Sequence, residues 1–313
     1  MSAAVDAPPG LPFAVVFGRP ATIAMPLARG YGLELDIPVL GGSAREALFP
    51  DAVRAQPSAD LQLFTSGDIL LGCVTERVAD PRALAHQSQE LYRRVLAAAR
   101  GHHLYRIWNY VPQINALADG FENYRAFCQG RSLAFEAEAG AGFPRVLPSA
   151  SGVGTADGCL SLVFVAGLAD PRHIENPEQL PAYCYPAEHG PRSPSFSRAT
   201  VVKLPARTLS FISGTAAIKG HQSIAPDVLE PQLTCTLDNL QLISQTSGLG
   251  ENLGADCALQ RHFKVYVRHA RDLKAVQTRL ERDLLKPADH VTYLQADICR
   301  AELLLEIEAT LIS

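Results

Sequence analysis

The sequence lacks the long apolar segments and the leader expected of membrane and secreted proteins. No apolar run approaches the ~18 residues that are needed to span a bilayer. The longest run, from Cys159 to Ala169, is interrupted by Ser161 and Gly167. The first ten residues contain neither a basic segment nor a continuous apolar core, so they do not resemble a secretion signal. We therefore expect a cytoplasmic protein with no membrane partner.

Common cofactor and metal motifs are missing as well. Neither Gly-x-Gly-x-x-Gly after a strand nor Gly-x-x-x-x-Gly-Lys occurs, which excludes the standard nucleotide cradles. The seven cysteines show no Cys-x-x-Cys spacing and are expected to be reduced thiols. The nine histidines show no His-x-x-x-His spacing, so no metal site is expected. Lys plus Arg number 28 against 32 Asp plus Glu, a net charge of −4 that argues against a nucleic-acid partner.

What the chain does have is the composition of a globular protein and an internal repeat. Its 313 residues are 47% apolar and 19% charged, and this length suggests two domains. The pattern Phe-x-Ser-Gly occurs at Phe64 and again at Phe211, 147 residues later. Two further pairs share that offset: Asp80 with Asp227, and Gly101 with Gly248. In each copy the Asp is expected to cap the start of a helix and the Gly to end that helix.

Each copy of the repeat predicts the same succession of elements. Apolar residues at helical spacing lie between each capping Asp and its Gly, and β-forming residues follow at 103–114 and 263–267. Second helices are expected at about 121–136 and from Asp272 to a stop at Pro287. The closing strands include 160–166 and 303–309. Each copy therefore reads ββαβαββ, and the expected fold class is α+β, with two such units in tandem.

A proline-rich stretch separates the two copies. Residues 169–198 contain six prolines, which is typical of an interdomain linker or of a lid over an active site. The interdomain linker is the default interpretation, but five rings and guanidiniums argue for more than a solvated tether; they are Tyr183, Tyr185, Arg192, Phe196 and Arg198. We therefore predict an N-terminal domain at 1–168, the linker or lid at 169–198, and a C-terminal catalytic domain at 199–313.

Two carboxylates near the C-terminus are the leading candidates for chemistry. Positions 303, 305, 307, 309 and 311 are all apolar, so Glu306 and Glu308 point to the other face of that strand, about 6.5–7 Å apart. The first copy has Val163 and Val165 at the matching positions. A solvated strand face is the plain alternative. If the face is amphipathic instead, a carboxyl beside apolar groups has a raised pKa and suits general-acid work.

Four other residues are weaker candidates from the sequence alone. Cys299 lies seven residues before Glu306, and a lone Cys is most often a small buried hydrophobe. Gly214 is either a turn residue or a point of close ligand approach. Arg131 and Tyr124 could bind an anion, or they could lie on an exposed helix surface.

Four segments together resemble the chorismatases, which look like two fused YjgF/RidA-like units. These segments are residues 106–115, 122–131, 148–154 and 299–308, and the similarity extends from about residue 30 to the end of the chain. The resemblance implies that the substrate is chorismate and that pyruvate is one product. It implies protonation of the enolpyruvyl ether by Glu306, without a cofactor. Substrate carboxylates would be held by Arg131, Tyr124, Tyr185 and Arg198.

The resemblance also bears on the second product. Gly214 and Cys299 resemble the members that form 3-hydroxybenzoate, alone or with 4-hydroxybenzoate, rather than a dihydrodiol. A thiol beside the acid holds an attacking water poorly, which favours attack by the ring hydroxyl on its neighbouring carbon. The protein is expected to be a monomer or a homotrimer.

Two rival functions remain open at this point. A RidA-like imine or enamine hydrolase shares the fold, but those proteins carry a substrate-binding arginine on the preceding strand. The corresponding stretch here, residues 290–296, contains no arginine. The other rival is a non-catalytic binder of small molecules.

Overall fold

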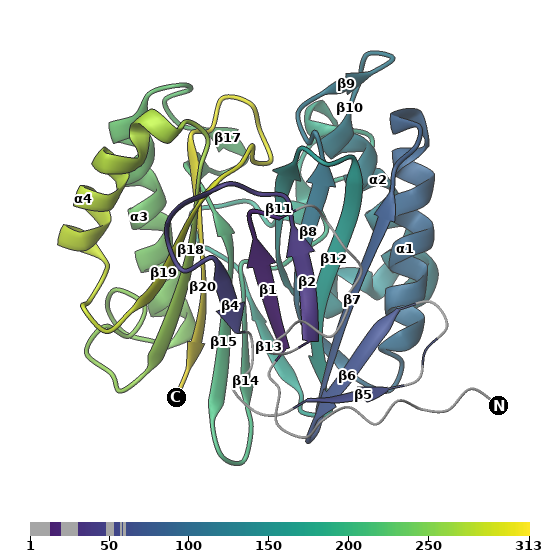
Figure 1. Cartoon of the computed structure of the whole chain (residues 1–313), viewed down its shortest axis with the longest axis horizontal. Coiled ribbons are helices and arrows are strands. Elements are labelled where there is room, and N and C mark those ends of the chain that lie inside the picture. The colour runs from purple at the N-terminus through teal and green to yellow at the C-terminus, as the bar shows by residue number, and fades with distance from the viewer. Residues whose placement is uncertain (1–12, 20–30, 48–52, 57, 59–60) are drawn as a thin grey trace.

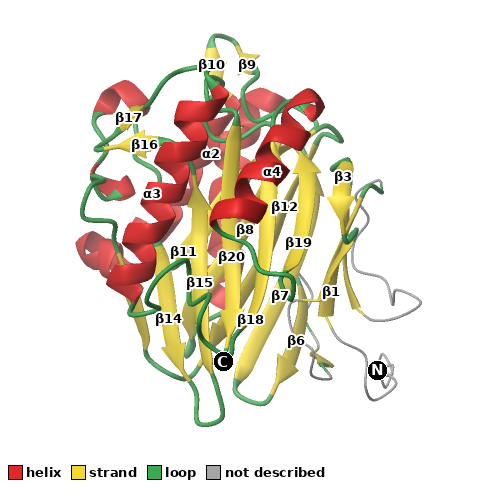
Figure 2. Cartoon of the chain, turned by 90° about the vertical axis from the view of Figure 1, so that its left-hand side faces the viewer, coloured by secondary structure: helices red, strands yellow, loops and turns green. Residues whose placement is uncertain are grey.

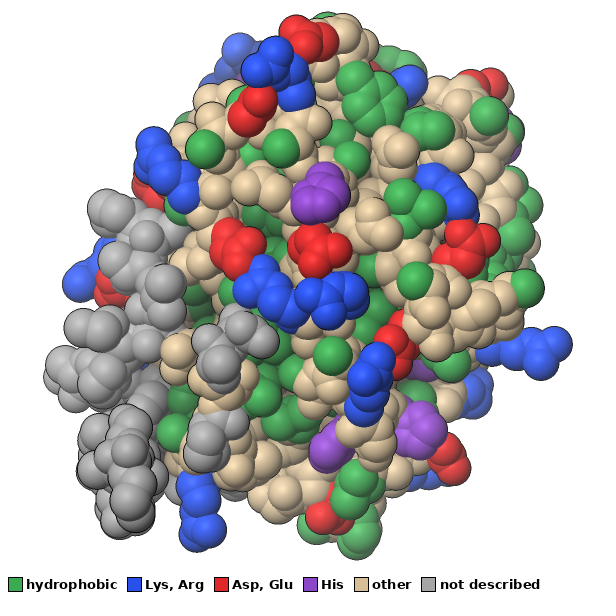
Figure 3. Space-filling model, turned by 90° about the vertical axis from the view of Figure 1, so that its right-hand side faces the viewer, with side chains coloured by type: hydrophobic (Ala, Val, Ile, Leu, Met, Phe, Trp, Pro, Cys, Tyr) green, Lys and Arg blue, Asp and Glu red, His purple; other side chains and the backbone are tan. Residues whose placement is uncertain are grey.

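Two β-sheets face each other at the centre of the molecule, and the helices lie on their outer sides (Figure 1). This computed structural model describes residues 13–19, 31–47, 53–56, 58 and 61–313. Each described helix is too short or too polar to span a lipid bilayer. On the side drawn in Figure 3, acidic and basic side chains are interspersed over the surface, in keeping with the balanced composition.

The first sheet has six strands in the order β11-β8-β12-β7-β6-β5. Their bounds are β5 Arg54–Gln56, β6 Gln62–Ser66, β7 Ile69–Arg77, β8 His103–Pro112, β11 Ser149–Thr155 and β12 Cys159–Gly167. Helices α1 (Leu84–Ala98) and α2 (Asn123–Ala139) pack against each other on its outer face. Leu162, Phe164 and Ala166 of β12 point toward these helices, because alternate residues of a strand face opposite sides.

The second sheet has seven strands in the order β13-β14-β15-β20-β18-β19-β3. Their bounds are β3 Val39–Gly42, β13 Pro171–Ile174, β14 Ala199–Lys203, β15 Thr208–Thr215, β18 Gln260–Val267, β19 His290–Gln295 and β20 Leu305–Ile312. Helices α3 (Leu229–Ser247) and α4 (Leu273–Asp283) cover this sheet from outside (Figure 2). Four short strands form two small hairpins, β9 Leu117–Ala118 with β10 Phe121–Glu122 and β16 Ile218–Lys219 with β17 Gln222–Ser223.

The tandem ββαβαββ prediction is confirmed by the strand order. The five strands of the first copy lie in the order β6-β7-β12-β8-β11, and those of the second copy in the order β14-β15-β20-β18-β19. In both copies the third and fourth strands are parallel, and the fifth lies between the second and the third. The two units therefore share one topology as well as one succession of elements.

The match between Phe64 and Phe211 was wrong. Phe64 lies in β6, the first strand of its copy, and Gly67 with φ +56° turns the chain into β7. Phe211 lies in β15, the second strand of its copy. The same short pattern thus occurs on non-equivalent strands, because the two copies do not keep a constant residue offset.

The expected helix ends are correct in some places and wrong in others. The Asp80 carboxylate accepts a hydrogen bond from the Arg82 amide at 3.0 Å, just before α1. Asp227 is not the cap of α3; Val228 holds that position, and Asp227 itself has φ +59°. Gly248 ends α3 in the left-handed conformation, as predicted. Asp272 precedes α4 without a side-chain capping bond, and α4 ends at Asp283, before Pro287 can stop it.

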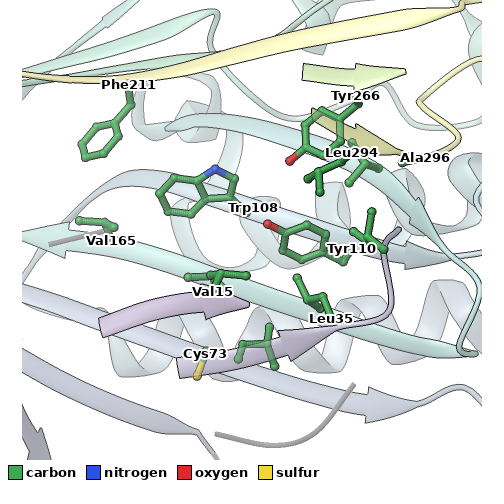
Figure 4. Packing of buried hydrophobic residues seen from close by; sticks show 14 of the residues in the cluster. Val15, Leu35, Cys73, Trp108, Tyr110, Val165, Phe211, Tyr266, Leu294 and Ala296 are labelled. Carbon is green, nitrogen blue, oxygen red and sulfur yellow. The ribbon is translucent and has the colours of Figure 1, made fainter. Parts of the chain in front are cut away.

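The central core lies between the two sheets. Trp108, Tyr110, Phe211 and Tyr266 meet there (Figure 4), with Val163 and Val165 among their buried neighbours. Three N-terminal strands form a separate small sheet whose apolar side chains join this core: β1 Phe13–Phe17, β2 Tyr31–Leu35 and β4 Arg45–Ala47. Residues buried between the sheets are thus supplied by both copies of the repeat.

The segment between the copies is more ordered than expected. Its first part, β13, pairs with β14 and so belongs to the second sheet. Two short 3₁₀ turns follow, η3 at Ala182–Cys184 and η4 at Ala187–His189. We call residues 175–198 the connector; several of its side chains line the cavity described next.

Candidate active site

A cavity of about 390 Å³ lies between the two units. Its walls come from α2, β11, the connector, β15 and the start of β20. Glu308, the second candidate carboxylate, does not line this cavity, but the other expected site residues do: Tyr124, Arg131, Tyr185, Arg198, Gly214, Cys299 and Glu306. Residues that are up to 182 positions apart in the chain (306 − 124) are therefore brought to one place.

Glu306 is a buried carboxyl whose Oε1 has no hydrogen-bond partner. It lies on β20 beside Tyr266 of β18, and only 3% of the residue is exposed. Burial, reinforced by the negative charge of Glu308, raises the pKa of Glu306 from 4.5 to about 8. The carboxyl therefore carries a proton at neutral pH. A protonated acid facing a cavity can deliver that proton to a bound molecule.

Glu308, two residues further along the strand, has the opposite environment. Its two oxygens accept hydrogen bonds from Arg106 Nη2 and Trp108 Nε1, each at 2.7 Å, and from Ser151 Oγ at 2.5 Å. Lys264 Nζ lies 2.7 Å from Oε1. Burial alone would raise the pKa of Glu308, but Lys264 and Arg106 hold it below its usual value. Glu308 is thus a fixed negative charge near Glu306, and neither carboxylate lies on a solvated face.

Gly214 makes room for the Glu306 carboxyl. It lies within β15 at a register shift between Ile212 and Thr215, where the ladder to β20 is interrupted by a bulge. A Cβ at position 214 would overlap the Glu306 side chain, its Oε1 above all. The interpretation of Gly214 as a turn residue was wrong, and its close neighbour is the acid.

Arg131 is buried with unused hydrogen-bond donors. It lies on α2, is 3% exposed, and stacks over the rings of Tyr92 and Phe135 at 5.3 and 5.9 Å. Its Nε and Nη2 atoms have no partner. An unpaired buried guanidinium is costly unless an anion binds to it. The alternative of an exposed helix surface was therefore wrong, and Arg131 is suited to hold a carboxylate.

Tyr185 and Arg198 form a second polar pair on the connector side. Arg198 Nη2 donates a hydrogen bond to Tyr185 Oη at 2.8 Å. The guanidinium also lies over the ring of Phe196, 5.0 Å from its centroid. Arg198 Nε makes no hydrogen bond but lies 3.9 Å from Glu175 Oε2, so the guanidinium faces a carboxylate on one side and is held by the two rings.

Tyr124 and Cys299 stay neutral in this cavity. Burial raises the pKa of the Cys299 thiol to about 12, and it raises the pKa of Tyr124 well above its usual value. A thiol with so high a pKa is not a thiolate nucleophile at neutral pH. Both groups can serve only as weak or neutral hydrogen-bonding neighbours of the acid.

Sequence reasoning missed other polar residues of the wall. Gln179 lies on the connector, and its amide nitrogen donates to the Ile218 carbonyl at 2.8 Å. Arg300 lies over the ring of Tyr185, 5.6 Å from its centroid. Ser151 lies inside one of the four similar segments, but only its bond to Glu308 shows what it does. The sequence pointed to Arg300 only through its position next to Cys299.

Comparison with known proteins agrees with this geometry. The family model described as "Chorismatase FkbO/Hyg5-like, N-terminal" matches residues 49–166. A 3-hydroxybenzoate synthase of Streptomyces hygroscopicus is 38% identical over 216 residues, which is 66% of this chain and 62% of that protein. A chorismatase of the same species is 38% identical over 240 residues, or 74% of this chain and 69% of that protein. The chain belongs to the chorismatase family.

Other chorismatases agree in sequence and in fold. A chorismatase of Streptomyces rapamycinicus is 39% identical over 213 residues, or 66% of this chain and 63% of that protein. The chain thus spans less than two thirds of the length of two of these curated relatives. A chorismatase crystal structure superposes with a TM-score of 0.82 at 30% identity and covers 96% of this chain and 92% of that one. The resemblance in four short segments therefore reflects family membership.

Proposed function

We propose that the protein cleaves chorismate to pyruvate and 3-hydroxybenzoate, with 4-hydroxybenzoate as a possible second aromatic product. The observation that carries this proposal is the buried, protonated Glu306 facing the cavity between the two units. Relatives of this chain bear the names chorismatase and 3-hydroxybenzoate synthase. A general acid beside guanidiniums suits a dianion whose exocyclic double bond must be protonated.

The first step is protonation of the enol ether. Glu306 delivers its proton to the methylene carbon, which leaves an oxocarbenium-like centre on the side chain. The ring hydroxyl then attacks the neighbouring ring carbon, whose bond to the ether oxygen breaks, and that oxygen departs as the keto oxygen of pyruvate. The hydroxyl proton returns to the Glu306 carboxylate. One carbon–oxygen bond of the resulting oxygen bridge then breaks, the carbon that keeps the oxygen loses its hydrogen as a proton, and the oxygen takes up a proton to give the phenol. The two products together contain the atoms of chorismate, so no water is consumed.

Substrate binding falls to the cationic side chains of the wall. Arg131 keeps two unpaired donors, and Arg198 lines the same cavity. Two guanidiniums can hold two carboxylates in a fixed orientation toward Glu306. Tyr124 and Tyr185 add neutral donors. The cavity volume of about 390 Å³ falls in the range of roughly 300–1,000 Å³ found for small-molecule sites.

The surroundings of Glu306 favour the internal route over hydrolysis. The Cys299 thiol, with a pKa of about 12, is a poor hydrogen-bonding group for an attacking water. Gly214 lets the acid lie directly against β15. We further propose that residues 1–168 and 199–313 act as the two domains, joined by 169–198. The protein would work in the cytoplasm as a monomer or a homotrimer, on a small molecule and without a cofactor.

The test is incubation with chorismate. Pyruvate is followed enzymatically, and the aromatic products are separated by chromatography. We expect equal amounts of pyruvate and hydroxybenzoate, and a loss of about 10²-fold or more in turnover for Glu306→Gln. Glu90→Gln, a change on the outer helix α1, serves as the control. A RidA-like imine hydrolase or a non-catalytic binder would release no pyruvate, and near-normal turnover of Glu306→Gln would remove Glu306 from the acid role.

A further inference from the structure

Two histidines and a glutamate converge at the edge of the cavity. His189 Nε2 lies 3.0 Å from His221 Nδ1. The Glu188 Oε1 atom is 3.4 Å from the first nitrogen and 3.3 Å from the second. The histidines are 32 residues apart, so a search for His-x-x-x-His could not find them. Among the described residues the fold thus assembles a three-donor group that the sequence did not indicate.

The group joins two separate segments of the chain. Glu188 and His189 belong to η4 of the connector, and His221 lies in the turn of the β16–β17 hairpin. Backbone hydrogen bonds hold these segments together: the Leu180 amide donates to the Gly220 carbonyl at 2.9 Å, and the Gly220 amide donates to the Glu178 carbonyl at 2.8 Å. The relative position of the donors is therefore set by the fold.

Ring packing fixes the orientation of the two imidazoles. Their planes meet at 71° with centroids 5.3 Å apart, and both rings lie against Tyr185, at 5.3 and 6.3 Å. Arg300 Nη2 also donates to the His221 carbonyl at 2.8 Å. Both imidazoles are thus supported by neighbours other than each other.

The spacing of the three donors is that of a tetrahedral metal site. Zn–N bonds of about 2.0–2.1 Å at tetrahedral angles separate neighbouring donor atoms by about 3.3 Å. The three separations here are 3.0, 3.3 and 3.4 Å. We propose that Glu188, His189 and His221 bind a divalent transition-metal ion of the zinc class, with a fourth position left open to water.

The charge state of the group suits a metal. A carboxylate oxygen and two imidazole nitrogens are donor types that zinc takes in proteins. Glu188 is 60% exposed in its side chain, which gives an ion access from solvent. The nearby cations are Arg300 and Arg125, and Glu188 supplies the negative charge that opposes them.

The bound ion would tie the connector to the β16–β17 hairpin. Since Glu188 and His189 line the cavity, this link would stabilise the part of the cavity wall that the connector forms. The reaction proposed above does not need the ion, so this site goes beyond that function. Its binding is measured without chorismate, and its failure leaves the proposed function untouched.

The test uses the full-length chain stripped of metal by a chelator. Zn²⁺ is titrated calorimetrically, and Co²⁺ is titrated with visible spectroscopy, because tetrahedral Co²⁺ absorbs strongly. We expect one ion per chain and a higher thermal midpoint with excess Zn²⁺. His221→Asn and Glu188→Gln should each weaken binding by about tenfold or more. Two ligand variants are used so that the test still holds if one of them fails to fold.

A second histidine pair provides the matched control. His262 and His290 stack nearly parallel, with centroids 4.7 Å apart and an interplanar angle of 18°, and within the part of the chain that the structure describes they belong to no three-donor group. His262→Asn should bind zinc like the unmodified chain. Equal binding by His221→Asn, Glu188→Gln and the unmodified chain would overturn the proposal. So would the absence of saturable binding, or a cobalt–thiolate band that assigns the ion to the exposed thiols Cys184 and Cys257.

Discussion

Replacement of Glu306 by glutamine should stabilise the protein, and increasingly so as the pH rises. The pKa of this carboxyl is about 8 in the folded chain against 4.5 for an ordinary glutamate. The unfolded chain therefore releases the proton above about pH 4.5, whereas the folded chain keeps it until about pH 8. Stability falls across that interval because the unfolded state is favoured by ionisation. At 1.36 kcal/mol per pKa unit, titration of Glu306 lowers the free energy of unfolding by about 3 kcal/mol at pH 7 and by about 5 kcal/mol well above pH 8.

The assay is urea denaturation of Glu306→Gln and of the unmodified chain between about pH 5 and pH 8. Glutamine does not titrate, so the difference in unfolding free energy between the two proteins should grow by about 3 kcal/mol over this range. Glu308→Gln is the contrasting control, because it removes the carboxylate that pairs with Arg106 and leaves Lys264 with Glu46 alone, and it should destabilise the fold by roughly 3–5 kcal/mol at pH 8. A difference between Glu306→Gln and the unmodified chain that stays constant with pH would refute the raised pKa and, with it, the acid role.

Four further predictions concern activity. The value of kcat/KM for pyruvate release should fall on the alkaline side with an apparent pKa of about 8, because Glu306 then loses its proton; a profile that is flat to about pH 10 would contradict this. Gly214→Ala should lower turnover by about 10²-fold with the thermal midpoint little changed, since the new Cβ displaces the acid; unaltered kcat would refute the close contact. Arg131→Met should raise KM by about tenfold or more, because a cation that binds the substrate is removed. The thermal midpoint should not fall, because Nε and Nη2 of Arg131 have no hydrogen-bond partner to lose; a normal KM would exclude Arg131 from binding. Cys299→Ala should change the ratio of products on chromatography more than the total rate, and an unchanged ratio would exclude it as a product determinant.

The strands of the site were predictable because strand geometry is strict. Apolar residues at 305, 307, 309 and 311 assign one face of β20 to the helix-covered core, which leaves Glu306 and Glu308 on the opposite face. Leu303, which was expected on the same face, precedes the strand and lies in the central core. The shared succession of elements located the two tandem units, and in the structure each closing strand lies near the centre of its sheet. What alternation could not tell is what covers the second face, and this depends on the packing of one sheet against the other.

Non-local contacts account for what was missed. The partners of Glu308 come from β8, β11 and β18, and no spacing rule links Arg106 to a carboxylate 202 residues later. The bulge that places Gly214 against Glu306 exists only in the paired strands. The offset between copies failed for Phe64 and Phe211 because loop lengths are not constrained by the core. The sequence alone offered Arg131 only as a weak candidate, and the resemblance to a family gave Arg131, Tyr185 and Arg198 their expected role. The packing that buries them was not foreseeable.

The different environments of Glu306 and Glu308 depend on each other. Glu308 can remain ionised between the sheets because Arg106 and Lys264 pair with it and Trp108 and Ser151 donate to it. Its fixed charge then adds to burial in raising the pKa of its neighbour. Arg106, Trp108 and Ser151 belong to the first copy of the repeat, and both glutamates belong to the second. The first unit, whose own closing strand has valines here, thus helps set the protonation state of an acid that lies in the other, which explains why one cavity needs both halves of the chain.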